Sequence, residues 1–254
     1  MPLHWPARLW LVRHGQSAGN VARDEAQAAR ARRIAIVGRD VDVPLSALGE
    51  RQSEALAYWW RTQPELERPD VVMSSPYIRA QQTLKLLGEN GAFARDTPPA
   101  IVDERLREKE FGILDGLTTL GIAADHPAQA ELRRQLGKFY HRPPGGEAWT
   151  DVILRLRSTL DTISLHHAGK RVLIVSHQVV VLCLRYLLEN LDEQRILAID
   201  KLGDVANCSL TEYRFPTASD GSVVPTLARY NFTVPLEDAG APVTTAPDAR
   251  VAVQ

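Results

Sequence analysis

The stretch Leu9-Trp-Leu-Val-Arg-His-Gly-Gln-Ser-Ala-Gly-Asn20 decides how the rest of the chain is interpreted. A short apolar run typical of a buried strand ends abruptly in Arg13-His14-Gly15, and Asn20 follows within a potential helical turn. The run therefore predicts a strand with a cation and an imidazole at its carboxyl end. Ligands of open α/β sheets bind beside the carboxyl ends of the strands, so a site is expected there.

Two further strands end in reactive or polar residues. Residues 171–175 are continuously apolar after Arg171, as central parallel strands are, and lead directly into Ser176-His177-Gln178. A shorter strand at 70–73 precedes Ser74-Ser75-Pro76. Ser75 is the expected cap and Pro76 the expected first turn of the next helix, which places Arg79 about one turn into that helix.

Strands and helices alternate along most of the chain, which predicts an α/β fold with a largely parallel sheet covered on both faces. The predicted strands are residues 9–12, 70–73, 101–103, 171–175, 207–215 and 225–232. Right-handed crossovers bring the ends of parallel strands to one edge of a sheet. The two arginines and two histidines at these ends are therefore expected to share one pocket.

Composition bounds the class of protein. The 254 residues suit one large domain, expected over residues 1–234, and a net charge of −1 gives no general case for binding nucleic acid or a membrane. Cys183 and Cys208 lie in apolar surroundings outside any Cys/His cluster, so buried free thiols are expected. No stretch has the length of an apolar membrane span and no charged segment leads into an apolar run at the N-terminus, so a cytoplasmic location is expected.

Three segments show no steady apolar period. Residues 21–41, rich in Ala and Arg, are interpreted as a solvated helix and loop in preference to a substrate lid. Residues 104–147 are expected to form an irregular insertion that faces the substrate. Residues 235–254, rich in Ala, Pro and Thr, are expected to form a C-terminal tail that is extended or loosely docked and has no catalytic role.

Two arginines and two histidines at one sheet edge predict an anion site. The planar fork of arginine matches phosphate oxygens and neutralises the charge that develops as a phosphoryl group transfers. The sequence has neither the HExxH metal spacing nor the GxxxxGK[ST] phosphate loop. Covalent catalysis by an imidazole is then the economical hypothesis, with His14 as the nucleophile and a phosphohistidine intermediate.

Such a nucleophile must be neutral, and nearby arginine charges favour the neutral imidazole. The leaving oxygen also needs a proton, which a carboxyl group held partly neutral by its surroundings can supply. Glu104, Glu108 and Glu110 are all candidates, and spacing alone does not choose between them.

With these residues in place, the sequence resembles the histidine phosphatase superfamily, in the branch of cofactor-dependent phosphoglycerate mutases, broad-specificity phosphatases and the fructose-2,6-bisphosphatase domain. The motifs that carry the resemblance span most of residues 9–190 in the family's order and spacing. They are Leu-Val-Arg13-His14-Gly15, Ser74-Ser75-Pro76 with Arg79 and Thr83, Leu106-Arg107-Glu108, Pro144-Gly145-Gly146-Glu147 and Val175-Ser176-His177. The resemblance implies a three-layer α/β/α sandwich with a mostly parallel sheet and neither metal nor other cofactor.

The resemblance also implies a role for each site residue. It makes His14 the phosphorylated histidine and Glu108 the proton donor. It assigns the phosphate-binding pocket to Arg13, Asn20, Arg79 and His177.

Substrate contacts follow from the bisphosphatase domain, which the sequence resembles most in residues 138–147 and at the pair His177-Gln178. Arg133, Lys138 and Gln178 match residues of that domain that contact the phosphorylated sugar. Thr119 and Leu182 stand where that domain has a Tyr and an Arg, which disfavours fructose-2,6-bisphosphate as the substrate.

The expected function is a metal-independent phosphomonoesterase that acts on a small phosphorylated metabolite. A cofactor-dependent phosphoglycerate mutase is the alternative enzyme, since Arg133-Arg134 loosely match the paired arginines of mutases. A catalytically silent phosphate-binding protein is the second alternative, against which the complete set of arginines, histidines and an acid argues. The expected partner is a small molecule; the oligomeric state is left open, with a homodimer among the candidates.

Overall fold

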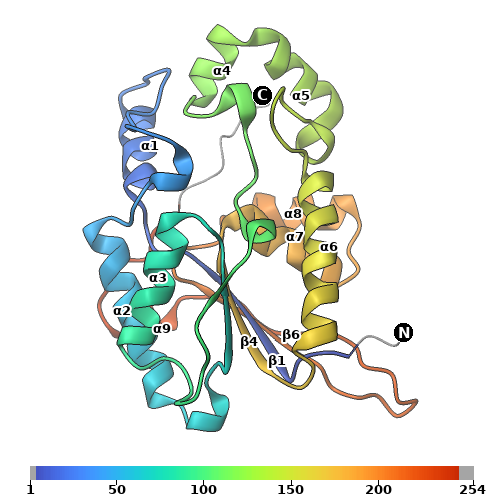
Figure 1. Cartoon of the computed structure of the whole chain (residues 1–254). Helices are drawn as coiled ribbons and strands as arrows, with labels where there is room; N and C mark the ends of the chain where they lie inside the picture. The colour runs from blue at the N-terminus through green and yellow to red at the C-terminus, as the bar shows by residue number, and fades with distance from the viewer. Residues whose placement is uncertain (1–3, 246–254) are drawn as a thin grey trace.

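One six-stranded sheet lies at the centre of the computed structural model, which describes residues 4–245 (Figure 1). Its strands lie in the order β3-β2-β4-β1-β5-β6. The bounds are β1 Arg8–Arg13, β2 Val71–Ser74, β3 Ile101–Val102, β4 Arg171–Ser176, β5 Leu210–Arg214 and β6 Thr226–Phe232. The strands from β3 to β1 pair in parallel, and β5 and β6 are added antiparallel. The predicted α/β fold with a mostly parallel sheet is confirmed.

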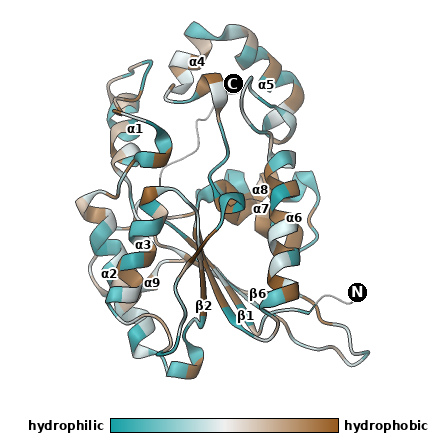
Figure 2. Ribbon diagram, in the orientation of Figure 1, coloured by the Kyte–Doolittle hydropathy of each residue, from teal (hydrophilic) through white to brown (hydrophobic). Residues whose placement is uncertain are grey.

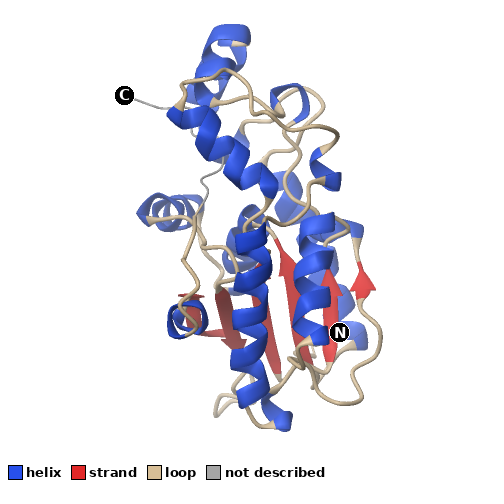
Figure 3. Ribbon diagram, turned by 90° about the vertical axis from the view of Figure 1, so that its left-hand side faces the viewer, coloured by secondary structure: helices blue, strands red, loops and turns tan. Residues whose placement is uncertain are grey.

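Helices cover both faces of this sheet, which gives the three expected layers (Figures 1 and 3). On one face lie α2, α3 and α9, and on the other lie α6, α7 and α8. The bounds are α1 Ala18–Ala28, α2 Ala47–Thr62, α3 Ile78–Glu89, α4 Thr119–Asp125, α5 Pro127–Tyr140, α6 Trp149–His166, α7 Gln178–Leu188, α8 Glu193–Leu202 and α9 Val234–Asp238.

The central strands are apolar because helices cover both faces of the sheet. Leu9 and Leu11 of β1 pack in the core cluster shared with α6 and α7, whereas Trp10 and Val12 pack in the cluster shared with α2 and α3. Successive side chains of a strand point to opposite faces, so a strand buried on both sides is apolar throughout. Figure 2 shows this pattern as brown strands between helices with teal outer surfaces.

The insertion at residues 104–147 is more regular than its sequence predicts. It contains the helices α4 and α5, the first capped by Thr118 and the second begun by Pro127. Besides Leu106 and Phe139, which pack in the core cluster shared with α6 and α7, its buried apolar side chains form one small cluster, Leu114, Leu117 and Ile122 with Ala130 beside it. A helix pair with so few buried side chains leaves no clear apolar period, so the expectation of irregular structure is wrong for the two helices within residues 119–140.

Residues 21–41 form the end of α1 and a loop, and most of them are exposed or half-buried, as their charge pattern predicts; the loop is also bonded to the insertion. The N–H of Ile34 donates to the carbonyl of Gly116 at 2.9 Å, and the N–H of Thr118 donates to the carbonyl of Arg32 at 3.0 Å. The segment is thus tied to the insertion by backbone bonds, which leave no periodic signal in the side chains. Together the two segments lie above the carboxyl ends of the parallel strands (Figure 1).

The first part of the predicted extended tail is folded onto the sheet layer. Residues 234–238 form α9, and Leu236 is fully buried against α2. Farther on, the Gln52 side chain donates to the Pro242 carbonyl at 2.8 Å, and the Asn207 N–H donates to the Thr244 carbonyl at 2.9 Å. Residues 246–254 of the predicted tail lie outside the described residues.

Cys183 and Cys208 are buried free thiols, as predicted. Within residues 4–245, none of the helices is both long and apolar enough to cross a membrane.

Candidate active site

Strand register brings the candidate residues to one edge of the sheet. Val175 of β4 lies opposite Val12 of β1 on one side and opposite Ser74 of β2 on the other. The residues that follow, His14, Ser75 and His177, therefore leave the sheet at nearly the same level. The ends of β1, β4 and β2 thus converge, as predicted.

Gly15 allows the loop after His14 to lie close against the backbone of α2. A Cβ atom at this position would lie 2.4 Å from the carbonyl oxygen of Gly49, at the start of α2. The Gly15 N–H donates to the Thr83 hydroxyl at 3.0 Å, and that hydroxyl donates to the Arg79 carbonyl at 2.9 Å. The loop after β1 is thus fixed to both α2 and α3.

Two contacts define the protonation of His14. Its Nδ1 lies 2.7 Å from the Gly15 carbonyl oxygen, which can only accept, so Nδ1 carries the proton. Its Nε2 accepts a hydrogen bond from Nε of Arg79 at 3.2 Å. The lone pair of the imidazole is therefore on Nε2, which faces Arg79.

The charge environment keeps both histidines neutral. Burial lowers the pKa of His14 well below its usual value, and the charges of Arg79 and Arg13 lower it further. Burial likewise lowers the pKa of His177, again with a contribution from Arg79. The imidazole of His14 is therefore neutral, and its Nε2 carries a lone pair and no proton.

These lowered pKa values predict a loss of stability in acid. Above about pH 6.5 the two histidines are neutral in both folded and unfolded chains. Below it the unfolded chain binds protons that the folded chain does not, so stability falls until the pH reaches the lowered pKa. Each histidine should lower the free energy of unfolding by about 1.4 kcal/mol between about pH 7.5 and 5.5.

Urea unfolding at the two pH values measures this effect. In His14→Asn the loss of stability on acidification should be smaller than in wild type by about 1.4 kcal/mol. An equal loss in the two proteins would contradict the lowered pKa of His14.

His177 lies against both His14 and the loop after β2. The His14 and His177 rings are 5.1 Å apart between centroids, and Nε2 of His177 is 2.8 Å from the Ser75 hydroxyl. Its Nδ1 is buried and has no hydrogen-bond partner in the described part of the chain. Ser75 is not the helix cap predicted from its sequence, because α3 begins at Ile78 after Tyr77, and Arg79 is the second residue of α3.

A cavity of about 380 Å³ opens beside Nε2 of His14. Its charged lining combines the guanidinium groups of Arg13, Arg23, Arg33 and Arg79 with the carboxyl groups of Asp40, Glu108 and Asp115. Burial raises the pKa of Asp115, and the charge of Asp40 adds to this rise. The cavity therefore favours an anion, since four guanidinium groups line it against three carboxyl groups, and burial disfavours the charged form of Asp115.

Five of the predicted site residues line this cavity: Arg13, His14, Asn20, Arg79 and Glu108. Arg13 is nearly buried and donates to the Val205 carbonyl. Asn20 is the third residue of α1, and its Oδ1 accepts from the Ser17 N–H at 3.0 Å.

The three glutamates that the sequence offers as candidate proton donors lie in different surroundings. Glu108 lines the cavity that holds His14, and Glu110 lines an adjoining cavity instead. Glu104 is exposed and lines neither. Their positions therefore favour the choice that the family resemblance implies.

The loop of Glu108 is anchored by the Pro-Pro-Gly-Gly-Glu segment. Glu147 of this segment pairs with Arg155 of α6 at 3.0 Å and accepts from the Glu110 N–H at 3.0 Å. Arg155 also donates to the Glu108 carbonyl at 3.2 Å. Gly112 is required here because a Cβ atom would lie 2.1 Å from the Pro144 carbonyl oxygen.

The residues predicted to contact a sugar do not line this cavity. Lys138 pairs with Asp200 at 2.8 Å, and the Gln178 amide donates to Asp204 at 2.9 Å. Arg133 lies on α5, outside the residues that line the cavity.

Four charged residues of the cavity were missed in the sequence: Arg23, Arg33, Asp40 and Asp115. They lie in residues 21–41 and 104–147, two segments without a steady apolar period that backbone bonds join to one another. Charge alone marks them in the sequence, and a charged residue is more often simply solvated.

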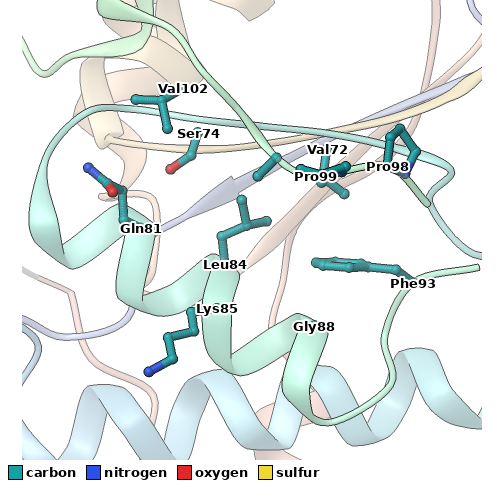
Figure 4. Close-up of a pocket in the computed structure, with 11 residues that line it drawn as sticks. Val72, Ser74, Gln81, Leu84, Lys85, Gly88, Phe93, Pro98, Pro99 and Val102 are labelled. Atoms are coloured by element: carbon teal, nitrogen blue, oxygen red, sulfur yellow. The ribbon is translucent and has the colours of Figure 1, made fainter.

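A second cavity, of about 330 Å³, lies between α3 and the edge of the sheet at β2 and β3 (Figure 4). Its walls include Leu84, Phe93 and Pro99, and none of the candidate site residues lines it. In residues 4–245 no group of three or more His, Cys, Asp or Glu side chains is arranged to hold a metal ion.

The model of one protein family, the histidine phosphatase superfamily (branch 1), matches residues 9–224. A probable phosphoglycerate mutase from Yersinia enterocolitica is 29% identical over 225 residues, covering 85% of this chain and 90% of that protein.

Solved structures also resemble the chain. A mycobacterial glucosyl-3-phosphoglycerate phosphatase is 28% identical and superimposes with a TM-score of 0.67, covering 89% of this chain and 99% of the other. A putative alpha-ribazole-5'-phosphate phosphatase from Escherichia coli K-12 shares the fold, with 18% identity and a TM-score of 0.67 over 89% of this chain and 98% of the other.

Proposed function

The chain belongs to the histidine phosphatase superfamily (branch 1), and from this premise we propose that it is a phosphomonoesterase that hydrolyses a small phosphorylated metabolite through a phosphohistidine on His14. One observation carries the proposal. The Gly15 carbonyl holds the proton on Nδ1 of His14, so that the Nε2 lone pair faces a guanidinium-lined cavity.

The first half-reaction transfers the phosphoryl group to the enzyme. Arg13 and Arg79 bind the phosphate oxygens and neutralise the charge that develops on them. Nε2 of His14 attacks phosphorus, so an N–P bond forms while the bond from phosphorus to the ester oxygen breaks. Glu108 donates a proton to the ester oxygen, and the alcohol leaves.

The second half-reaction returns the enzyme to its starting state. Water attacks the phosphohistidine, Glu108 takes up a proton from that water, and the N–P bond breaks to release inorganic phosphate. His177 assists in both halves. It is fully buried and does not line the cavity, but its Nε2 is engaged with Ser75 and its ring lies 5.1 Å from that of His14, so it supports the position of the nucleophile.

The outer part of the cavity supports a more specific substrate class. Beyond the reacting groups its lining continues with Arg23 and Arg33, beside the apolar side chains of Ile34 and Ile36. A second anionic group on the substrate would be attracted by these arginines. The solved relative is named for a substrate with a phosphoglycerate group, which carries a carboxylate in addition to its phosphate.

A phosphate-release screen tests the function. We expect hydrolysis of p-nitrophenyl phosphate, and faster turnover of 3-phosphoglycerate than of glycerol 3-phosphate, which has no second anion. A bisphosphate in the same series shows whether the second anionic group of the substrate must be a carboxylate or can also be a phosphate. No phosphate release from any ester, with inorganic phosphate still bound, would favour the silent binding protein.

A phosphoglycerate mutase is the second candidate, because a relative with 29% identity is named a probable mutase. A mutase protects the phosphohistidine from water long enough to return the phosphoryl group to a second position. Interconversion of 3- and 2-phosphoglycerate that depends on added 2,3-bisphosphoglycerate and exceeds phosphate release would identify it.

A further inference from the structure

The guanidinium group of Arg79 is held from two sides. Its Nε donates to Nε2 of His14 at 3.2 Å. Its Nη1 and Nη2 donate to the two carboxylate oxygens of Asp40, each at 3.0 Å, and Nη1 also donates to the Asp40 carbonyl oxygen at 2.7 Å. A guanidinium offers two edges to an oxyanion, Nη1 with Nη2 and Nε with Nη2. Asp40 occupies the first edge and leaves the second facing His14.

Asp40 is itself fixed relative to α3, the helix that carries Arg79. It begins a single 3-10 turn, Asp40–Asp42, in which the Asp42 N–H donates to the Arg39 carbonyl at 3.0 Å and the Val43 N–H donates to the Asp40 carbonyl at 3.3 Å. Just after the turn, the Leu45 N–H donates to the side chain of Gln82 on α3 at 2.8 Å. The segment that carries Asp40 is thus bonded to the helix that carries Arg79, in addition to the ion pair between the two side chains.

Burial makes this ion pair important for orientation. The Arg79 side chain is only 6% exposed, whereas that of Asp40 is 38% exposed. A buried guanidinium needs partners for its donors, because it cannot recover the lost hydration elsewhere. Without the Asp40 carboxylate, Arg79 would satisfy its Nη donors by turning, and its Nε/Nη2 edge would no longer face His14.

We propose that Asp40 is a positioning residue, which holds Arg79 by its Nη1/Nη2 edge so that the Nε/Nη2 edge is presented to the phosphoryl group at His14. This inference rests on the proposed function, which places the phosphoryl group at Nε2. The opposite role for the same carboxylate is competition, in which an incoming phosphate must displace it from Arg79. The two roles have opposite effects on phosphate affinity, because positioning strengthens phosphate binding and competition weakens it.

The test compares Asp40→Asn with Asp42→Asn. Asp42 lies on the same turn, carries the same charge and does not line the cavity, so it is the matched control. We expect Asp40→Asn to lower kcat/KM for p-nitrophenyl phosphate by about 10- to 100-fold, the scale of a misoriented contact, and to weaken inorganic phosphate binding in calorimetry. Asp42→Asn should change neither by more than about twofold. Unchanged activity, or tighter phosphate binding, in Asp40→Asn would overturn the proposal.

The Arg79→Ala background separates positioning from a general structural role. If Asp40 acts through Arg79, adding Asp40→Asn to Arg79→Ala should cause no further loss of activity or phosphate binding. Additive losses would show that Asp40 acts otherwise. A wild-type protein that binds phosphate but hydrolyses no ester would refute the proposed function alone, because the binding measurements still report on Asp40.

Discussion

His14→Ala is expected to abolish hydrolysis of p-nitrophenyl phosphate, with a fall in kcat on the order of 10⁴-fold or more. The reason is that the reaction passes through a bond between Nε2 and phosphorus, and no neighbouring group in the cavity can replace that nitrogen. A good leaving group does not help, because the attacking atom itself is gone. Steady-state kinetics at neutral pH measures the change.

The controls for this variant separate chemistry from folding. His166→Ala removes an exposed histidine at the end of α6 and should leave kcat unchanged. Since Arg13 and Arg79 remain, His14→Ala should still bind inorganic phosphate. Turnover close to wild type in His14→Ala would rule out His14 as the nucleophile.

Glu108→Gln is expected to lower the rate by about 10²- to 10⁴-fold for alkyl phosphates and much less for p-nitrophenyl phosphate. An alkoxide is a poor leaving group and needs a proton as the P–O bond breaks, whereas p-nitrophenolate is stable without one. The carboxamide of Gln cannot donate such a proton. Rates for a series of esters with leaving groups of rising pKa measure the effect.

Glu104→Gln is the matched control for Glu108, because Glu104 lies on the same segment, is exposed and does not line the cavity. It should leave the dependence on the leaving group unchanged. Equal losses for all esters in Glu108→Gln would indicate that Glu108 positions the substrate and does not supply the proton.

The sheet and the reacting ends of its strands could be predicted from the sequence. The apolar runs before His14 and after Arg171 are long enough to identify central parallel strands, and parallel strands meet at one edge. The neutral form of His14 also followed from its arginine neighbours, and burial, which the sequence only suggests, adds the largest contribution to its lowered pKa.

The walls of the cavity could not be predicted. Asp40 and Arg33 come from segments without a period, and they reach the cavity through backbone bonds that connect positions about eighty residues apart. Ser75 was a reasonable helix cap by residue type, yet its hydroxyl contacts His177 because β2 ends beside β4. The sugar contacts inferred for Lys138 and Gln178 stay a prediction, and in this structure their side chains bond to Asp200 and Asp204.

Rapid quenching of the reaction tests the central claim most directly. Wild-type enzyme mixed with p-nitrophenyl phosphate and quenched in alkali, where phosphohistidine survives, should carry one phosphoryl group on the peptide that contains His14, by mass spectrometry. The label should be lost in acid and should be absent from His14→Ala. A phosphoryl group on any other residue, or ester hydrolysis with no phosphorylated enzyme at any quench time, would contradict a phosphohistidine mechanism at His14.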